Sequence, residues 1–186
     1  DSYRNLLEHY IAKGISGVIP LGTTGECPTV LDYEFEKIIE TTVAAVNGRI
    51  PVYVGAGGNF TKKVLKKLKS VEKYDVQGIL SVCPYYNRPS QHGIFQHFLQ
   101  ISEATSQDIV IYNIPYRTGR NIENDTMLEL AALKNIVGVK DSCGDVKQTM
   151  HFLSHKPDND SFKIFSLRVT PVSSNLFPVP FKVKSA

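Results

Sequence analysis

The sequence predicts an α/β fold built on a parallel sheet. Apolar runs of strand length recur along the 186 residues, and amphipathic helical patterns lie between them. The first residues of successive runs are 26 to 34 positions apart, which is the length of one strand and one crossover helix. With 42% apolar and 21% charged residues, the chain can form a packed core. The expected strands are Gly17–Leu21, Pro51–Val54, Gly78–Cys83, Asp108–Ile114, Ile136–Lys140 and Phe162–Phe165.

Each interval that we assign to a helix carries one apolar stripe. The first helix, Ser2–Lys13, comes before any strand, so a strand that should precede it is absent. Val30–Asn47 is followed by Gly48, a residue that suits a helix C-cap. Thr61–Tyr74 sets an apolar stripe against five lysines, a pattern that favours a solvated helix face over a nucleic-acid site. Ser90–Thr105 is the fourth expected helix.

Periodicity alone fits either an open doubly wound sheet or a closed eight-stranded barrel. A complete (β/α)8 barrel typically needs about 250 residues. If the chain is a barrel, it is therefore incomplete at both ends. Residues 166–186 contain three prolines and no amphipathic helix, so we expect a partial barrel over 1–165 and an atypical tail over 166–186.

Composition excludes several classes of function. A net charge of +3 is too small to make nucleic acid the default partner. The apolar runs are only a few residues long, whereas a membrane-spanning helix needs roughly 20. Three cysteines without a Cys-x-x-Cys pair favour a reducing, cytoplasmic setting. His151 and His155 are four residues apart but lack the glutamate of a zinc-protease motif, so we expect no metal site.

Lys140 is the first candidate for chemistry. It ends an apolar strand, and parallel α/β folds place their active sites at the C-terminal ends of strands. Burial lowers the pKa of an amine, and a neutral amine can attack a ketone to form a Schiff base. The alternative interpretation is a solvated lysine at a strand end.

Three other strand ends carry polar groups. Tyr112 and Arg117 follow the strand Asp108–Ile114 and supply a phenol and a guanidinium suited to a carboxylate. Thr23 and Thr24 lie in a glycine-flanked turn that exposes hydroxyl and backbone N–H groups. Tyr86 places a second phenol near the same edge. Taken singly, each could be a core or surface residue without a role in chemistry.

Four segments together resemble a known family. They are 22–26 (Gly-Thr-Thr-Gly-Glu), 84–91 (Pro-Tyr-Tyr-Asn-Arg-Pro-Ser-Gln), 112–119 (Tyr-Asn-Ile-Pro-Tyr-Arg-Thr-Gly) and 139–142 (Val-Lys-Asp-Ser). In order and spacing they resemble the dihydrodipicolinate synthase / N-acetylneuraminate lyase superfamily, and most of all its dihydrodipicolinate synthase branch. The resemblance covers residues 1 to 165 and implies an incomplete (β/α)8 TIM barrel that lacks the first strand and the last quarter. The family's Ser-Gly-Asp-Asp-like turn after the seventh strand is replaced here by Ser-Leu-Arg-Val from residue 166.

The resemblance also implies a mechanism that uses no cofactor. Lys140 matches the lysine that forms an imine with pyruvate, which then loses a methyl proton to give an enamine. Tyr112 matches the proton-transferring phenol, and Thr23 and Tyr86 match its relay partners. In the family Tyr86 acts across a subunit interface, so the resemblance implies a homo-oligomer.

Substrate specificity is implied by two further positions. Thr24 matches a position that binds the pyruvate carboxylate, and Arg117 matches the group that binds the carboxylate of L-aspartate-4-semialdehyde. The expected reaction is the condensation of these two substrates in lysine and diaminopimelate biosynthesis. Two alternatives stay open: an N-acetylneuraminate lyase or other pyruvate-dependent 2-keto acid aldolase, against which Arg117 argues, and a non-catalytic remnant that associates with intact homologues.

Overall fold

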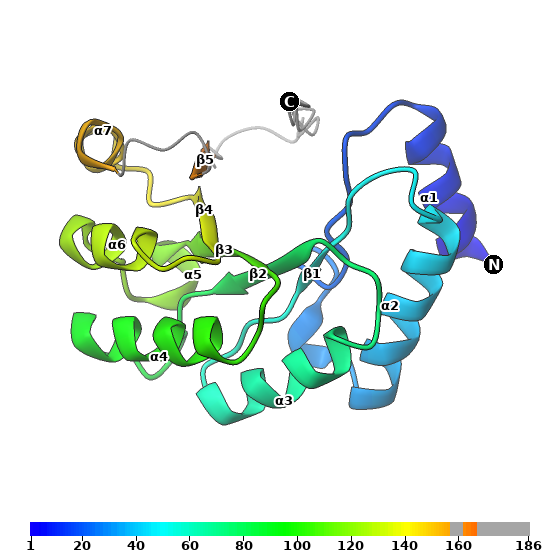
Figure 1. Cartoon of the computed structure of the whole chain (residues 1–186), viewed down its shortest axis with the longest axis horizontal. Helices are drawn as coiled ribbons and strands as arrows, with labels where there is room; N and C mark the ends of the chain where they lie inside the picture. Colours follow the sequence, from blue (N-terminus) through cyan, green and yellow to red (C-terminus); the bar gives the residue numbers. More distant parts are fainter. Residues whose placement is uncertain (157–161, 167–186) are drawn as a thin grey trace. The chain divides into compact units, whose positions relative to one another are not determined.

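A computed structural model describes residues 1–156 and 162–166 of the chain (Figure 1). The described residues form two compact units. The first holds residues 1–55 and 70–78, and the second holds residues 56–69, 79–156 and 162–166. The expected atypical tail over 166–186 lies outside the described residues except for Ser166, which is the last residue of a strand. No helix among the described residues is long and apolar enough to cross a membrane.

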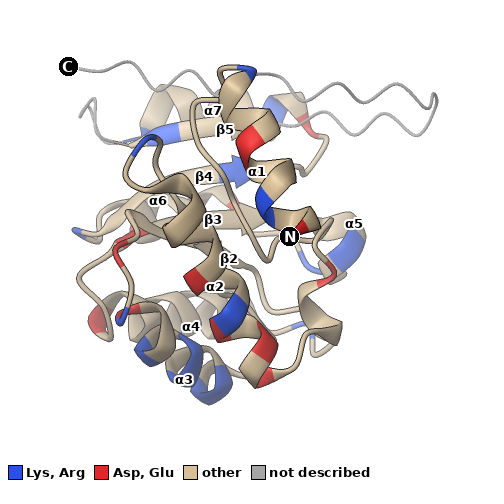
Figure 2. Ribbon diagram, turned by 90° about the vertical axis from the view of Figure 1, so that its right-hand side faces the viewer, with Lys and Arg blue, Asp and Glu red and all other residues tan. Residues whose placement is uncertain are grey.

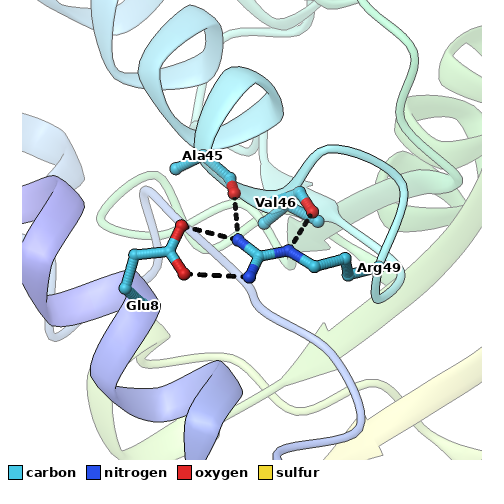
Figure 3. A network of polar contacts seen from close by, with 4 residues as sticks. All are labelled: Glu8, Ala45, Val46 and Arg49. Atoms are coloured by element: carbon cyan, nitrogen blue, oxygen red, sulfur yellow. Dashed lines mark hydrogen bonds and ion pairs between the residues drawn. The ribbon is translucent and has the colours of Figure 1, made fainter.

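Two packed helices dominate the first unit, α1 (Ser2–Ala12) and α2 (Asp32–Val46). The side chain of Arg49 joins them, because its guanidinium donates to both carboxylate oxygens of Glu8 at 2.9 and 2.6 Å (Figure 3). The same guanidinium donates to the carbonyls of Ala45 and Val46 at the end of α2. Arg49 therefore satisfies carbonyl groups that a helix C-terminus leaves without partners.

The expected strand Gly17–Leu21 is shorter than predicted. Only Val18 forms a bridge, parallel to Val52, next to the three-residue strand β1 (Tyr53–Gly55). Pro20 has no N–H to donate and Leu21 adopts a φ of 60°, so regular pairing cannot continue. The two segments nevertheless run so close that a Cβ at Gly55 would lie 2.0 Å from the Leu21 carbonyl oxygen. A short 3-10 helix, η1 (Cys27–Thr29), follows before α2.

The second unit has the strand–helix alternation that the sequence predicts. Its strands β2 (Gly78–Val82), β3 (Asp108–Asn113), β4 (Ile136–Asp141) and β5 (Lys163–Ser166) are neighbours in that order. The pairs β3–β4 and β4–β5 are parallel. The helices are α3 (Thr61–Val71), mostly in this unit, α4 (Gln91–Glu103), α5 (Pro115–Thr118), α6 (Asn124–Ala131) and α7 (Val146–His155). The sequence patterns did not predict α5 and α6.

Local sequence explains where the helices begin and which faces they bury. Ser90 caps α4 by accepting from the Gly93 N–H at 3.2 Å, and Asp145 caps α7 by accepting from two backbone N–H groups. On α3, Val64 and Leu68 are buried, whereas Lys62, Lys63, Lys66 and Lys69 are exposed. Figure 2 shows the basic positions along the ribbon of this helix. The predicted solvated lysine face is therefore confirmed.

The buried face of α4 includes one polar side chain, His97, which the apolar pattern of this helix did not predict. His97 accepts or donates one hydrogen bond through Nδ1, to Thr61 Oγ1 at 2.9 Å, and its ring lies edge-on to Phe98. Its Nε2 is buried without a hydrogen-bond partner among the described residues. Burial lowers the pKa of His97 to about 4, because the charged imidazolium would lose its hydration.

We predict that His97 makes the fold sensitive to acid. Its pKa in the folded state lies below the unfolded value of about 6.5, so protons bind preferentially to the unfolded chain. The stability that the neutral His97 contributes is fully present when the pH is above the unfolded-state pKa. It is lost as the pH falls toward the folded-state pKa, and the loss in unfolding free energy reaches about 3 kcal/mol at pH ~4.

Urea unfolding between pH 7 and 4 measures this effect in the native chain, in His97→Gln and in the control His92→Gln, whose side chain is exposed. We expect His97→Gln to lose less unfolding free energy with falling pH than the other two proteins. Equal pH slopes in all three would contradict the prediction.

Candidate active site

The parallel register of β3 and β4 places Tyr112 and Lys140 side by side. The two residues are paired across the strands, and Lys140 Nζ lies 4.3 Å from the centroid of the Tyr112 ring. Tyr112 is 7% exposed and Lys140 is half-buried. Paired residues in neighbouring strands point to the same face of a sheet, so the register accounts for the contact. The ring face attracts the ammonium group when it is charged, but the pKa of Lys140 is lowered, so the loss of hydration on burial outweighs this attraction.

Burial shifts the protonation equilibrium of Lys140 toward its neutral amine, relative to a lysine in water. Burial lowers the pKa of Lys140, because the ammonium form loses hydration next to the Tyr112 ring. Within residues 1–156 and 162–166, the ion pairs of the structure do not include this lysine. A half-buried amine with a lowered pKa can reach a small carbonyl compound and attack it.

Sequence reasoning missed a polar pair one residue beyond Tyr112 and Lys140. Asn113 Nδ2 donates to Asp141 Oδ1 at 3.2 Å, and both side chains are buried. Asp141 also accepts from the Cys143 N–H at 3.1 Å and from the Thr149 hydroxyl at 2.8 Å. Because side chains alternate along a strand, this pair lies on the opposite face from Lys140. The available signal was a polar residue at the end of each of two apolar strands.

The loop after β2 is held in a strained backbone conformation. Tyr86 has a φ of 72° and Arg88 a φ of 49°, values that bulky residues rarely adopt. Asn87 ties the loop to the turn at Asn59 through two hydrogen bonds of 2.9 and 3.2 Å. Arg88 packs against Gly119, where a Cβ would lie 2.8 Å from its Nε. Tyr86 itself is 89% exposed, so it makes little contact within the chain.

Arg117 lies on α5, the short helix that starts directly after β3. Its backbone N–H donates to the Ile114 carbonyl at 3.0 Å, and the buried Thr118 hydroxyl donates to the carbonyls of Ile114 and Arg120. Gly119 ends the helix with a φ of 71°. The Arg117 side chain is exposed. The helix thus presents a cation within five residues of Tyr112 along the chain.

Thr23 and Thr24 belong to the first unit, where both are exposed in a tight turn. The Gly25 N–H donates to the Gly22 carbonyl and the Glu26 N–H to the Thr23 carbonyl, each at 3.1 Å. Their roles as proton relay and carboxylate-binding group stay predictions. Within the second unit, the structure brings together Tyr112 and Lys140 among the predicted site residues.

A family model and curated relatives match this chain. The model described as the dihydrodipicolinate synthetase family matches residues 1–166. The 4-hydroxy-tetrahydrodipicolinate synthase 2 of Clostridium acetobutylicum is 59% identical over 160 residues, which cover 86% of this chain and 56% of the relative. The chain therefore spans about half the length of the curated relatives it matches.

Solved structures agree with the family match. The dihydrodipicolinate synthase of Thermotoga maritima has a TM-score of 0.85 and 44% identity, covering 89% of this chain and 57% of its own. A chloride-inhibited dihydrodipicolinate synthase of Acinetobacter baumannii was solved as a complex with pyruvate. It has a TM-score of 0.83 and 35% identity, and the match covers 88% of this chain and 55% of that chain. These likenesses confirm the predicted fold class, an incomplete (β/α)8 barrel.

We predict that the Tyr112 ring controls the acidity of Lys140. Tyr112→Ala would admit water to the amine and raise its pKa toward the ordinary value, whereas Tyr112→Phe would keep the ring and the lowered pKa. The rate at which acetic anhydride labels Lys140, followed by peptide mass spectrometry across pH 6 to 11, reports this pKa. The exposed Lys134 is the internal reference. Unchanged labelling of Lys140 in Tyr112→Ala would contradict the prediction.

Proposed function

The chain belongs to the dihydrodipicolinate synthetase family, and from this premise we propose that it acts as a lysine-imine lyase on pyruvate. The proposed reaction condenses pyruvate with L-aspartate-4-semialdehyde in lysine and diaminopimelate biosynthesis. The observation that supports it best is the half-buried Lys140 amine next to the Tyr112 ring. The pyruvate complex of the Acinetobacter baumannii relative supports the choice of the first substrate.

In the proposed mechanism, the neutral Lys140 amine attacks the ketone carbon of pyruvate. The resulting carbinolamine loses water to give a protonated imine, which withdraws electrons from the adjacent methyl group. The methyl group then loses a proton, and the enamine carbon attacks the aldehyde carbon of the second substrate. Tyr112 carries a phenol, and its ring lies beside the Lys140 amine, so we assign it the role of moving these protons.

Two exposed groups are proposed to select the substrates. The hydroxyl and N–H groups of the turn at Thr24 suit the pyruvate carboxylate. Arg117 suits the carboxylate of the semialdehyde, because its guanidinium can donate two parallel hydrogen bonds. We propose Thr23 and Tyr86 as the remaining members of the proton relay.

The conformation of Tyr86 supports a homo-oligomer as the working form. A bulky residue at positive φ costs about 1–2 kcal/mol, and here the strained backbone carries an aromatic ring that is 89% exposed. Local strain at an exposed aromatic residue is typical of functional and contact sites. We propose that Tyr86 reaches its partners across a subunit interface.

Borohydride trapping tests the imine. With pyruvate present, reduction should leave a stable adduct on Lys140, and peptide mass spectrometry should locate it there. Lys140→Arg should abolish the adduct, because a guanidinium is not nucleophilic at neutral pH. Lys134→Arg, which changes an exposed lysine, should keep it. An adduct that survives Lys140→Arg would rule out the assignment.

Substitution of Arg117 tests the second substrate. Arg117→Ala should raise the KM for L-aspartate-4-semialdehyde by about 10–100-fold, the cost of losing charged hydrogen bonds. Trapping of pyruvate on Lys140 should be unchanged, and Arg117→Lys should lie between the two. A coupled assay with either the semialdehyde or sialic acid gives the KM and separates the two enzyme classes. An unchanged KM in Arg117→Ala would exclude this residue from substrate binding.

A further inference from the structure

The short helix α5 depends on its neighbours for its position. It has four residues, whereas an isolated helix shorter than about 12 residues is only marginally stable in water. Its backbone bonds, of 2.8 to 3.0 Å, run from the N–H groups of Arg117, Thr118 and Gly119 to the carbonyls of Ile114 and Pro115. Contacts outside the helix must therefore hold Arg117, the cation that it carries, in place.

One buried residue holds α5 from the side of the core. Thr118 is 2% exposed, and its hydroxyl oxygen lies 3.1 Å from the Ile114 carbonyl oxygen and 2.8 Å from the Arg120 carbonyl oxygen. Ile114 follows directly after β3. The chain on both sides of Gly119 is therefore attached to the end of this strand.

A second contact to α5 comes from another loop. Arg88 lies in the loop after β2, and its guanidinium packs on Gly119, the residue that ends α5. A Cβ at Gly119 would lie 2.8 Å from Nε, 3.3 Å from Nη2 and 3.4 Å from Cζ of Arg88. Three guanidinium atoms are thus close to one point of the backbone, and the glycine leaves room for them. Both residues are exposed, so this contact lies on the solvent side.

The loop that carries Arg88 is itself constrained. Arg88 has a φ of 49° and Tyr86 a φ of 72°, a conformation that is unfavourable for residues with a Cβ. Asn87, between them, is tied to Asn59 by two hydrogen bonds of 2.9 and 3.2 Å. Strained backbone persists where the surrounding structure holds it, and it occurs most often at functional sites. In this conformation the Arg88 side chain reaches α5.

An ion pair does not account for the contact. Gly119 carries no charge, and the ion pairs among the described residues include neither Arg88 nor Arg117. Packing of the guanidinium on the backbone is the interaction that joins the loop to the helix. We propose that Arg88 is a positioning residue. By packing on Gly119 it holds α5, and it thereby keeps Arg117 in the orientation that receives the carboxylate of the second substrate. This inference rests on the function proposed for Arg117.

Hydrogen exchange tests whether Arg88 holds α5. In Arg88→Ala, the amides of Arg117 and Gly119 should exchange about tenfold faster than in the native chain, because local opening of the helix becomes easier. The amides of β3 are the internal reference and should be unchanged. Arg4→Ala, which removes an exposed arginine of α1, is the matched control. Equal exchange at Arg117 and Gly119 in Arg88→Ala and the native chain would overturn the proposal.

Kinetics test whether Arg88 acts through Arg117. Arg88→Ala should raise the KM for L-aspartate-4-semialdehyde by about tenfold, while kcat and the trapping of pyruvate on Lys140 stay unchanged. The double variant Arg88→Ala/Arg117→Ala should have the KM of Arg117→Ala alone, since a residue that acts through another has no effect once the other is gone. Arg88→Lys should restore little, because an ammonium group lacks the planar surface that packs on Gly119.

Several kinetic results would overturn the proposal. An unchanged KM in Arg88→Ala would remove its basis, and losses that multiply in the double variant would mean that Arg88 binds the carboxylate itself. Full recovery with Arg88→Lys would assign the effect to charge alone. A fall in pyruvate trapping, or faster exchange in β3, would mean that Arg88→Ala damages the fold.

The exchange measurement uses no substrate. A native chain that fails to trap pyruvate would refute the proposed function, and the exchange rates would still decide whether Arg88 holds α5. Failure of imine formation and failure of positioning are therefore separate results.

Discussion

The alignment of β3 with β4 is the constraint on which the candidate site depends. In a strand, a shift of one residue turns every side chain to the other face. Such a shift would move Lys140 away from Tyr112 and into the layer between strands and helices, where a charged amine is costly. The Asn113–Asp141 hydrogen bond opposes this shift from the helix-facing side, and the Ser142 N–H adds a backbone bond of 2.8 Å to the Asn113 carbonyl. The same pairing of β3 with β4 therefore fixes the strand register and places the Lys140 amine beside the Tyr112 ring.

Burial shifts the pKa of several titratable groups among the described residues, and their accessibility differs. Burial raises the pKa of the Cys83 thiol to about 12 and lowers that of His97 to about 4. Both side chains are enclosed, so the first is an inert thiol and the second a neutral packing residue. Lys140 is half-buried, which lowers its pKa while one side stays open to a substrate. This combination of desolvation and access distinguishes Lys140 from the enclosed Cys83 and His97.

The sequence was sufficient to predict the elements that follow from local patterns. The strands β2, β3 and β4 match the predicted apolar runs at their first residues and within one residue at their last. The strand Gly17–Leu21 was predicted too long because its apolar pattern was followed past Pro20, although a proline has no N–H to donate. The positive φ of Leu21 could not be read from the pattern. The helix α6 was not predicted, because its eight residues give only a short amphipathic pattern. Contacts such as His97 with Thr61 depend on the tertiary fold and have no local signature.

Separate parts of the proposed chemistry depend on separate parts of the chain. Formation of a nucleophilic amine needs only Tyr112 and Lys140, which two neighbouring strands of one unit bring together. The residues proposed to select the substrates lie outside those strands, because Arg117 is on α5 and Thr24 is in a turn of the first unit. Strand pairing is set by backbone hydrogen bonds, so the contact between the Lys140 amine and the Tyr112 ring depends on the pairing of β3 with β4. The proposed turnover is more demanding, since the proposal also assigns roles to Arg117 and to the exposed Tyr86. Imine formation and complete catalysis should therefore differ in how much of the barrel they need.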